Sequence, residues 1–263
     1  MKTIKQTFRL FTASVTMLLR DRLALFGMLA FPVLFVVAMS LFDMRFETMP
    51  GVSAEGNYFD FVLPGLLAMG LMNFALVGIA ASVARFREMR ILKRITATPL
   101  RPSSFIAGQV GAYLVIAMAQ TLIMLTAGVL LGATVNGSWF YILVLAAMGN
   151  MVFLAMGFAV AGRADSVDGA TNIAGLMTIP LMFLTGLFFP VEAMPKVMQS
   201  AVEWLPMTPL VEGMRKISLE SASLTDLGSQ IALLAGWVVA SFLIARMNFR
   251  FGGRAAMTAK TSS

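Results

Sequence analysis

Apolar residues occur along this chain in long runs, separated by short polar or basic segments. Runs without Asp, Glu, Lys or Arg occupy residues 23–42, 61–84, 102–162 and 170–189, and a nearly uncharged run covers 227–246. A helix needs about 20 apolar residues to cross the hydrocarbon core of a bilayer. The longest run therefore predicts two spans, joined by a turn at Asn136-Gly137, a dipeptide typical of turns. The pattern as a whole predicts six spans.

We interpret residues 1–263 as one all-α integral membrane domain with six transmembrane helices. The spans are expected at 23–42, 59–84, 105–132, 139–161, 170–189 and 227–246. Residues 1–22 place apolar side chains on one helical face and basic ones on the other, which is typical of an amphipathic interfacial helix. Residues 190–226 are hydrophobic but broken by Pro206 and Pro209, so we expect an external re-entrant or interfacial segment of short, non-spanning helices.

Composition supports a membrane protein. Hydrophobic residues make up 59% of the chain and charged residues 13%, whereas soluble domains carry about 45–50% and about 25%. The mean hydropathy is +0.84. A soluble core could not bury so much apolar surface, so the solvent for most of this chain is the bilayer.

The distribution of basic residues predicts the topology. Sixteen of the 20 Lys and Arg residues fall on one side of the six-span arrangement, namely in residues 1–22, 85–104 and 247–263 and at Arg163 and Arg246. Because Lys and Arg accumulate in cytoplasmic loops, both termini and the tail 247–263 are expected in the cytoplasm. We expect a multi-pass protein of the bacterial inner membrane, in contact with lipid and not with nucleic acid.

The sequence lacks several residue types that commonly take part in catalysis or metal binding. It contains no Cys and no His, which removes thiolate ligands and the commonest metal ligand and general base. No Lys, Arg, Asp or Glu is expected inside the six spans, which disfavours a proton- or sodium-coupled transporter, a channel and an intramembrane enzyme. No G-x-x-x-x-G-K-[ST] loop occurs, so the chain is not expected to bind ATP itself. We therefore predict no catalytic residue, metal site or cofactor in this chain.

Uncharged polar side chains also occur inside the predicted spans, and we single out four of them as candidates: Asn73, Gln120, Asn150 and Asn172. Such groups commonly form hydrogen bonds between helices, each contributing about 0.6 kcal/mol. They could instead line a substrate path, and the sequence leaves both interpretations open.

The connection between the second and third spans, residues 85–104, is unusually basic and also patterned. Phe86, Met89, Leu92 and Ile95 recur every three residues, with basic residues away from them. A topology signal needs only positive charge, whereas an apolar helical face predicts a structured element. The pattern therefore favours a docking surface for another protein, in addition to the role of the positive charge as a topology signal.

Two long motifs give the chain a family resemblance. Residues 87–110, REMRILKRITATPLRPSSFIAGQV, precede the third span, and residues 184–215, LTGLFFPVEAMPKVMQSAVEWLPMTPLVEGMR, follow the fifth. In sequence and in position, both resemble the hallmark motifs of ABC-2 type permeases. The external re-entrant motif comprises Gly186, Pro190, Met194, Pro195, Pro206 and Pro209.

The resemblance implies the membrane subunit of an ATP-binding cassette exporter. In that family two permease subunits pair, a homodimer being expected here, and two cytoplasmic ATPases that hold ATP and Mg dock beneath them. The connection after the second span forms the contact with the ATPase. The residues that the resemblance assigns to this coupling are Arg87, Glu88, Leu92, Lys93, Arg94, Thr98, Pro99, Leu100 and Arg101.

The expected function is outward transport of an amphipathic or lipid-like compound or drug, because the spans offer uncharged surface rich in Met and Phe. An alternative within the family is export of a polysaccharide or lipo-oligosaccharide, for which we would expect more aromatic residues than 3 Trp and 3 Tyr. A membrane-embedded enzyme or assembly factor is the alternative from a different class.

Overall fold

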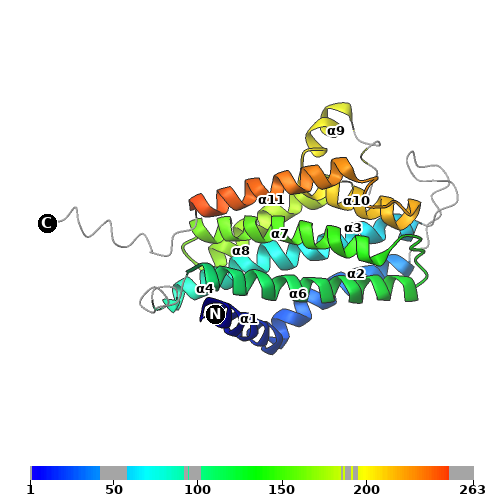
Figure 1. The fold of residues 1–263 in the computed structure, drawn as a ribbon. Helices are drawn as coiled ribbons and strands as arrows, with labels where there is room; N and C mark the ends of the chain where they lie inside the picture. Colours follow the sequence, from blue (N-terminus) through cyan, green and yellow to red (C-terminus); the bar gives the residue numbers. More distant parts are fainter. Residues whose placement is uncertain are drawn as a thin grey trace.

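The computed structural model describes residues 2–41, 58–91, 94, 102–184, 186, 191 and 195–248, and within these ranges the regular structure is helical without strands. The helices are α1 (Lys2–Arg20), α2 (Arg22–Leu41), α3 (Tyr58–Met72), the π-helix η1 (Asn73–Val77), α4 (Gly78–Glu88), α6 (Pro102–Leu130), α7 (Trp139–Arg163), α8 (Val167–Leu184), α9 (Lys196–Val202), α10 (Met207–Glu220) and α11 (Gly228–Asn248). The long helices lie side by side in one bundle (Figure 1).

Five helices in the described part of the chain are long and apolar enough to cross a membrane. They are Tyr58–Glu88, Ser103–Leu130, Trp139–Arg163, Val167–Leu184 and Gly228–Met247. The first predicted span, 23–42, coincides with α2. Within α2, only Pro32–Leu41 is assigned as an apolar helix, and it is shorter than the 18 residues taken as the minimum for a span. The count of six spans therefore stays a prediction.

The helix built from α3, η1 and α4 forms the centre of the bundle. Every residue of α3 is buried, and the segment packs against α2, α6, α7, α8 and α10. At Asn73 the backbone widens into a π-helical turn, and the Asn73 Nδ2 donates to the Met69 carbonyl one turn earlier at 3.2 Å. Such π-bulges are rare and frequently lie at functional sites.

Helix α7 packs directly against this π-helical turn. A Cβ atom added at Gly157 would collide with the Ile79 side chain and would lie 2.7 Å from the Leu76 carbonyl oxygen. Glycine thus lets the backbones of α7 and η1 approach closely. Helix α7 also packs extensively against α11.

Helix α1 lies on the outside of the bundle, against the first turns of α6 (Figure 1). Gly108 and Gly111 of α6 make room for Leu10 and Phe11, since an added Cβ at Gly108 would lie 2.9 Å from the Leu10 Cβ. Phe8 is 66% exposed and Leu19 55% exposed. The apolar residues of α1 therefore divide between a face against α6 and an exposed face.

After α8 the chain forms two short helices, α9 and α10. Helix α10 is largely buried and packs against α3, α7 and α11. It also meets the loop between α6 and α7, because the backbone N–H of Asn136 donates to the Ser218 carbonyl at 2.9 Å. The Trp237 indole of α11 donates to the Trp204 carbonyl at 2.8 Å, which joins α11 to the segment between α9 and α10.

Candidate functional site

The candidate coupling residues start at the last turn of α4. Arg87 and Glu88 end this helix, and Arg94 is exposed beyond it. Leu92, Lys93, Thr98, Pro99, Leu100 and Arg101 lie outside the described residues. The end of α4 lies beside the start of α6 and the last turns of α7 and α11 (Figure 1). We call this part of the bundle the basic end, after Arg85, Arg87, Arg163 and Arg246.

Arg87 and Glu88 both bind the loop between α7 and α8. The Arg87 Nη1 donates to the Ala164 carbonyl at 2.9 Å, and the Glu88 Oε1 accepts from the Val167 amide at 2.8 Å. Val167 is the first residue of α8, so Glu88 satisfies one of the amides that a helix start leaves without a partner. We call this pair of contacts the α4–α8 clasp.

A second acceptor at the start of α8 comes from its own N-cap residue. The Ser166 Oγ accepts from the Gly169 amide at 3.0 Å, which is the usual N-cap geometry. Asp168 adds a negative charge in the first turn, where the helix dipole favours it. Helix α8 is therefore capped once by its own sequence and once by α4.

A small apolar cluster lies where α4 ends and α6 begins. Phe86 of α4 and Phe105 of α6 are both buried and meet edge to face, with ring centroids 5.5 Å apart. Leu10 of α1 and Ile91 pack against this pair. The root of the connection thus holds α1, α4 and α6 together.

The expected helical face through Phe86 and Met89 does not continue in the structure. Helix α4 ends at Glu88, and Arg90 adopts φ = 56°, a left-handed conformation. Phe86 is buried whereas Met89 is 61% exposed. The prediction of one shared face was wrong for these two residues, because the turn at Met89 and Arg90 breaks the helical period; Leu92 and Ile95 lie outside the described residues.

The four polar span residues lie in different surroundings. Asn73 is half-buried at the π-helical turn, and Gln120 is buried on α6, where its Nε2 faces Gly70 of α3. Asn150 of α7 is completely buried, and within the described part of the chain neither atom of its amide has a hydrogen-bond partner. Asn172 is exposed on α8. The structure therefore does not bring these four residues together on one surface, and a path-lining role for them stays a prediction.

Asn172 belongs to an open face of α8. Ile173, Leu176, Ile179 and Phe183 on this helix are between 44% and 72% exposed. Asn172 therefore adds an amide that can form hydrogen bonds to an exposed helix face that is otherwise apolar.

At the opposite end of the bundle, Arg215 of α10 joins three segments. Its Nη2 donates to the Gly186 carbonyl at 2.9 Å, its Nε donates to the Phe61 carbonyl at 3.3 Å, and its guanidinium lies 3.6 Å from the centroid of the Phe61 ring. Gly186 has φ = 72°, a conformation that glycine adopts without strain. Arg215 thus attaches the beginning of the external motif to α3.

Of the other external motif residues, Pro195 and Pro206 directly precede α9 and α10. Pro209 lies in the first turn of α10, where proline is tolerated because its missing N–H would have no helical partner. Pro190 and Met194 lie outside the described residues.

The expectation that no charged residue lies inside the spans needs two corrections, at Asp60 and at Arg246, which is the last residue of the predicted span 227–246 and is exposed. Asp60 falls within the predicted span 59–84 and is buried in the first turn of α3. Its Oδ1 accepts from the Thr134 amide at 2.7 Å, so it bonds the loop that follows α6. Sequence reasoning missed the structural roles of Asp60 and Arg215, because their partners are 74 and 154 residues away.

Comparison with known proteins agrees with the motif resemblance. A family model described as ABC-2 type transporter matches residues 5–219. Nodulation protein J of Rhizobium leguminosarum bv. trifolii is 27% identical over 223 residues, which cover 84% of this chain and 83% of that protein. Inner membrane transport permease YadH of Escherichia coli (strain K12) is 21% identical over 210 residues, 80% of each chain. Linearmycin resistance permease protein LnrN of Bacillus subtilis (strain 168) is 22% identical over 167 residues, 64% of this chain and 43% of that protein.

Proposed function

The chain belongs to the ABC-2 type transporter family, and from that membership we propose that it is the membrane-spanning permease subunit of an ATP-driven exporter in a bacterial inner membrane. ATP and Mg would be bound by two cytoplasmic ATPase subunits, and a second permease chain would complete the transporter. The similarity to an inner membrane transport permease and to a resistance permease supports this proposal.

The structural observation that carries the proposal is the α4–α8 clasp. The coupling connection begins where α1, α4 and α6 meet, and from there Arg87 and Glu88 reach the loop that starts α8. A force applied to the connection would thus be transmitted to two spans, α4 through the backbone and α8 through hydrogen bonds. This arrangement supports the proposal of a permease that is driven by a separate ATPase.

The exposed residues of the connection are suited to contact another protein. Met89, Arg90 and Arg94 are exposed, in contrast to the buried Phe86 beneath them. An exposed methionine followed by two exposed arginines offers an adaptable apolar contact with charge at its rim. We place the ATPase contact on this surface, with Arg87 and Glu88 acting behind it as positioning residues.

The proposed cargo is an amphipathic or lipid-like compound or drug. Support comes from the open face of α8, where Asn172 accompanies a stripe of large apolar side chains. The similarity to a permease named for linearmycin resistance is consistent with a drug as cargo.

The proposal is tested by copurification with the ATPase encoded in an adjacent reading frame. Arg94→Glu should lower the amount of ATPase that is retained, whereas Lys196→Glu, the same charge reversal at an exposed residue of the opposite end, should leave it unchanged. The purified permease alone should hydrolyse no ATP. Equal retention by both variants would contradict the docking surface. Growth of a deletion strain on a panel of drugs and detergents then identifies the cargo class, and unchanged sensitivity to every compound would argue against an amphipathic cargo.

A further inference from the structure

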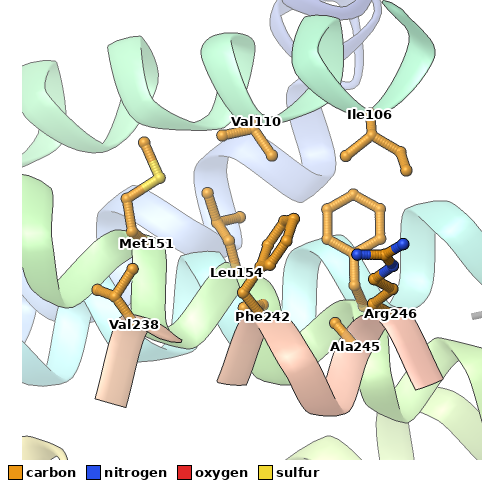
Figure 2. Close-up of a pocket in the computed structure, with 10 residues that line it drawn as sticks. Ile106, Val110, Met151, Leu154, Val238, Phe242, Ala245 and Arg246 are labelled. Atoms are coloured by element: carbon orange, nitrogen blue, oxygen red, sulfur yellow. The ribbon is translucent and has the colours of Figure 1, made fainter. Parts of the chain in front are cut away.

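An apolar cavity lies between α6, α7 and α11 at the basic end (Figure 2). Its volume is about 310 Å³, within the range of roughly 300–1,000 Å³ that is usual for ligand pockets. Ile106 and Val110 line it from α6, Leu154 and Phe158 from α7, and Phe242 from α11. Among the described residues that line it, Arg246 is the one that is ionisable, so the cavity combines alkyl and phenyl walls with a guanidinium.

The cavity has the depth of one membrane leaflet. On α11 its lining extends from Val238 to Arg246, and eight residues at 1.5 Å each correspond to about 12 Å along the helix axis. Half of the hydrocarbon core of a bilayer measures about 15 Å. The guanidinium is at the end of this length that also carries the other bases, and the walls toward the middle of the bundle are apolar (Figure 2).

Arg246 is available for an anionic ligand. It is exposed in the last turn of α11, and no carboxylate or carbonyl of the described residues forms a hydrogen bond or ion pair with it. Basic pockets between transmembrane helices bind anionic lipid headgroups. A phosphate at Arg246 would place the attached acyl chain directly into the apolar cavity.

The other flank of α11 has a similar construction. A cavity of about 230 Å³ between α7, α8 and α11 is walled by Met156, Met177 and Ile244, and Arg163 lines it. Arg163 ends α7 and therefore also lies at the basic end. The combination of an apolar groove with one arginine is thus repeated beside the same helix, which favours a lipid over a single specialised ligand.

We propose that the cavity between α6, α7 and α11 holds one acyl chain of an anionic phospholipid from the leaflet at the basic end, with its phosphate bound by Arg246. The bound lipid fills the space that separates α11 from α6. This site goes beyond the proposed transport function and does not depend on it.

The test measures lipid binding to the purified, delipidated full-length protein by native mass spectrometry. Phosphatidylglycerol and phosphatidylcholine with identical acyl chains are the probes. The wild-type protein should retain phosphatidylglycerol more strongly. Arg246→Gln should lower the affinity for phosphatidylglycerol about fivefold, which corresponds to about 1 kcal/mol for one basic residue at the membrane surface. It should lower the affinity for phosphatidylcholine less, because the choline cation already offsets the charge of that phosphate. Lys5→Gln removes an exposed charge of α1 outside the cavity and is the matched control.

A second variant tests the apolar part of the site. Ala155 lines the cavity, and Ala155→Phe would fill it, so both lipids should bind more weakly. Arg246 is exposed, so its replacement preserves the fold and supplies a result even if the Phe variant does not fold. Equal binding of phosphatidylglycerol by the wild-type and Arg246→Gln proteins would overturn the proposal. It would also be overturned if Ala155→Phe separated a dimer into monomers, since the occupant would then be a second copy of the chain.

Discussion

Replacing Glu88 distinguishes a residue that positions α8 from one that contacts the ATPase directly. Glu88→Ala removes the acceptor of the Val167 amide and leaves every basic residue of the connection in place. Loss of a helix-start acceptor costs about 1 kcal/mol, within a range of about 0.5–2. Glu88→Gln keeps an acceptor oxygen and loses only the interaction of its charge with the helix dipole, about 0.3–1 kcal/mol.

These magnitudes predict different hydrogen-exchange rates at the start of α8. Since 1.4 kcal/mol is a factor of ten, Glu88→Ala should raise the exchange rate of the amides at residues 167–171 about fivefold, and Glu88→Gln about twofold. Mass spectrometry of the purified protein measures both. Ser166→Ala removes the other acceptor, which serves the Gly169 amide, and so should raise the same rates without touching α4.

Transport then separates the two roles of Glu88. If the clasp transmits motion, Glu88→Ala should reduce transport, Glu88→Gln should restore much of it, and Ser166→Ala should transport normally despite its faster exchange. If Glu88 instead paired with a base of the ATPase, Gln and Ala would be equally defective, and exchange at 167–171 would match the wild type. That second pattern would refute the positioning role.

Three further predictions concern packing, topology and a helix end. Gly157→Ala should destabilise the protein by about 1–3 kcal/mol, because its methyl group would press on Ile79 and Leu76. The control is Gly175→Ala on α8, whose methyl group meets nothing within 4 Å and should not destabilise the protein. Similar thermal stability of the two variants would contradict the close packing of α7 and η1. In this cysteine-free chain, a cysteine at Ser103 or Ser166 should resist an impermeant thiol reagent in intact cells and one at Ser221 should react, and a reactive Ser166 would disprove the topology. Ser103 is exposed, whereas a cysteine at its buried neighbour Ser104 would resist the reagent on either side of the membrane. Ser221→Gly should raise the melting temperature, since Ser221 ends α10 with φ = 56° and a left-handed residue other than glycine costs about 1–2 kcal/mol; a lower melting temperature would contradict this.

The sequence predicted helix positions well wherever an apolar run had clear ends. The expected span 139–161 corresponds to Trp139–Arg163, and 227–246 to Gly228–Asn248, because turn residues and charges limit both runs. The predicted span 170–189 begins three residues late relative to α8, since the Ser166 cap and Asp168 extend this helix into polar sequence.

The contacts that give the candidate site its shape could not be predicted in the same way. The clasp joins Glu88 to Val167, 79 residues later, and a single sequence carries no periodicity that reports such a pairing. The burial of α10 was equally hidden. Its alternation of apolar residues with Glu, Arg and Lys is what an interfacial helix would show, and only the packed α3 and α7 reveal that its apolar side faces the interior.

The π-helical turn at Asn73–Val77 sets the rotational phase between the two halves of the central span. Each residue of an α-helix advances the helix by about 100°, so a π-bulge, which accommodates one extra residue, offsets everything beyond it by about that angle. Arg87 and Glu88 face the α7–α8 loop with this offset included. If the turn tightened into regular α-helix while α3 stayed fixed, the end of α4 would rotate by about 100° and carry both side chains away from their acceptor and donor. Deleting one residue between 73 and 77 would remove the extra residue itself, so a regular α-helix through this segment would leave Arg87 and Glu88 close to their present orientation. The length of the segment and its π-helical form are therefore coupled.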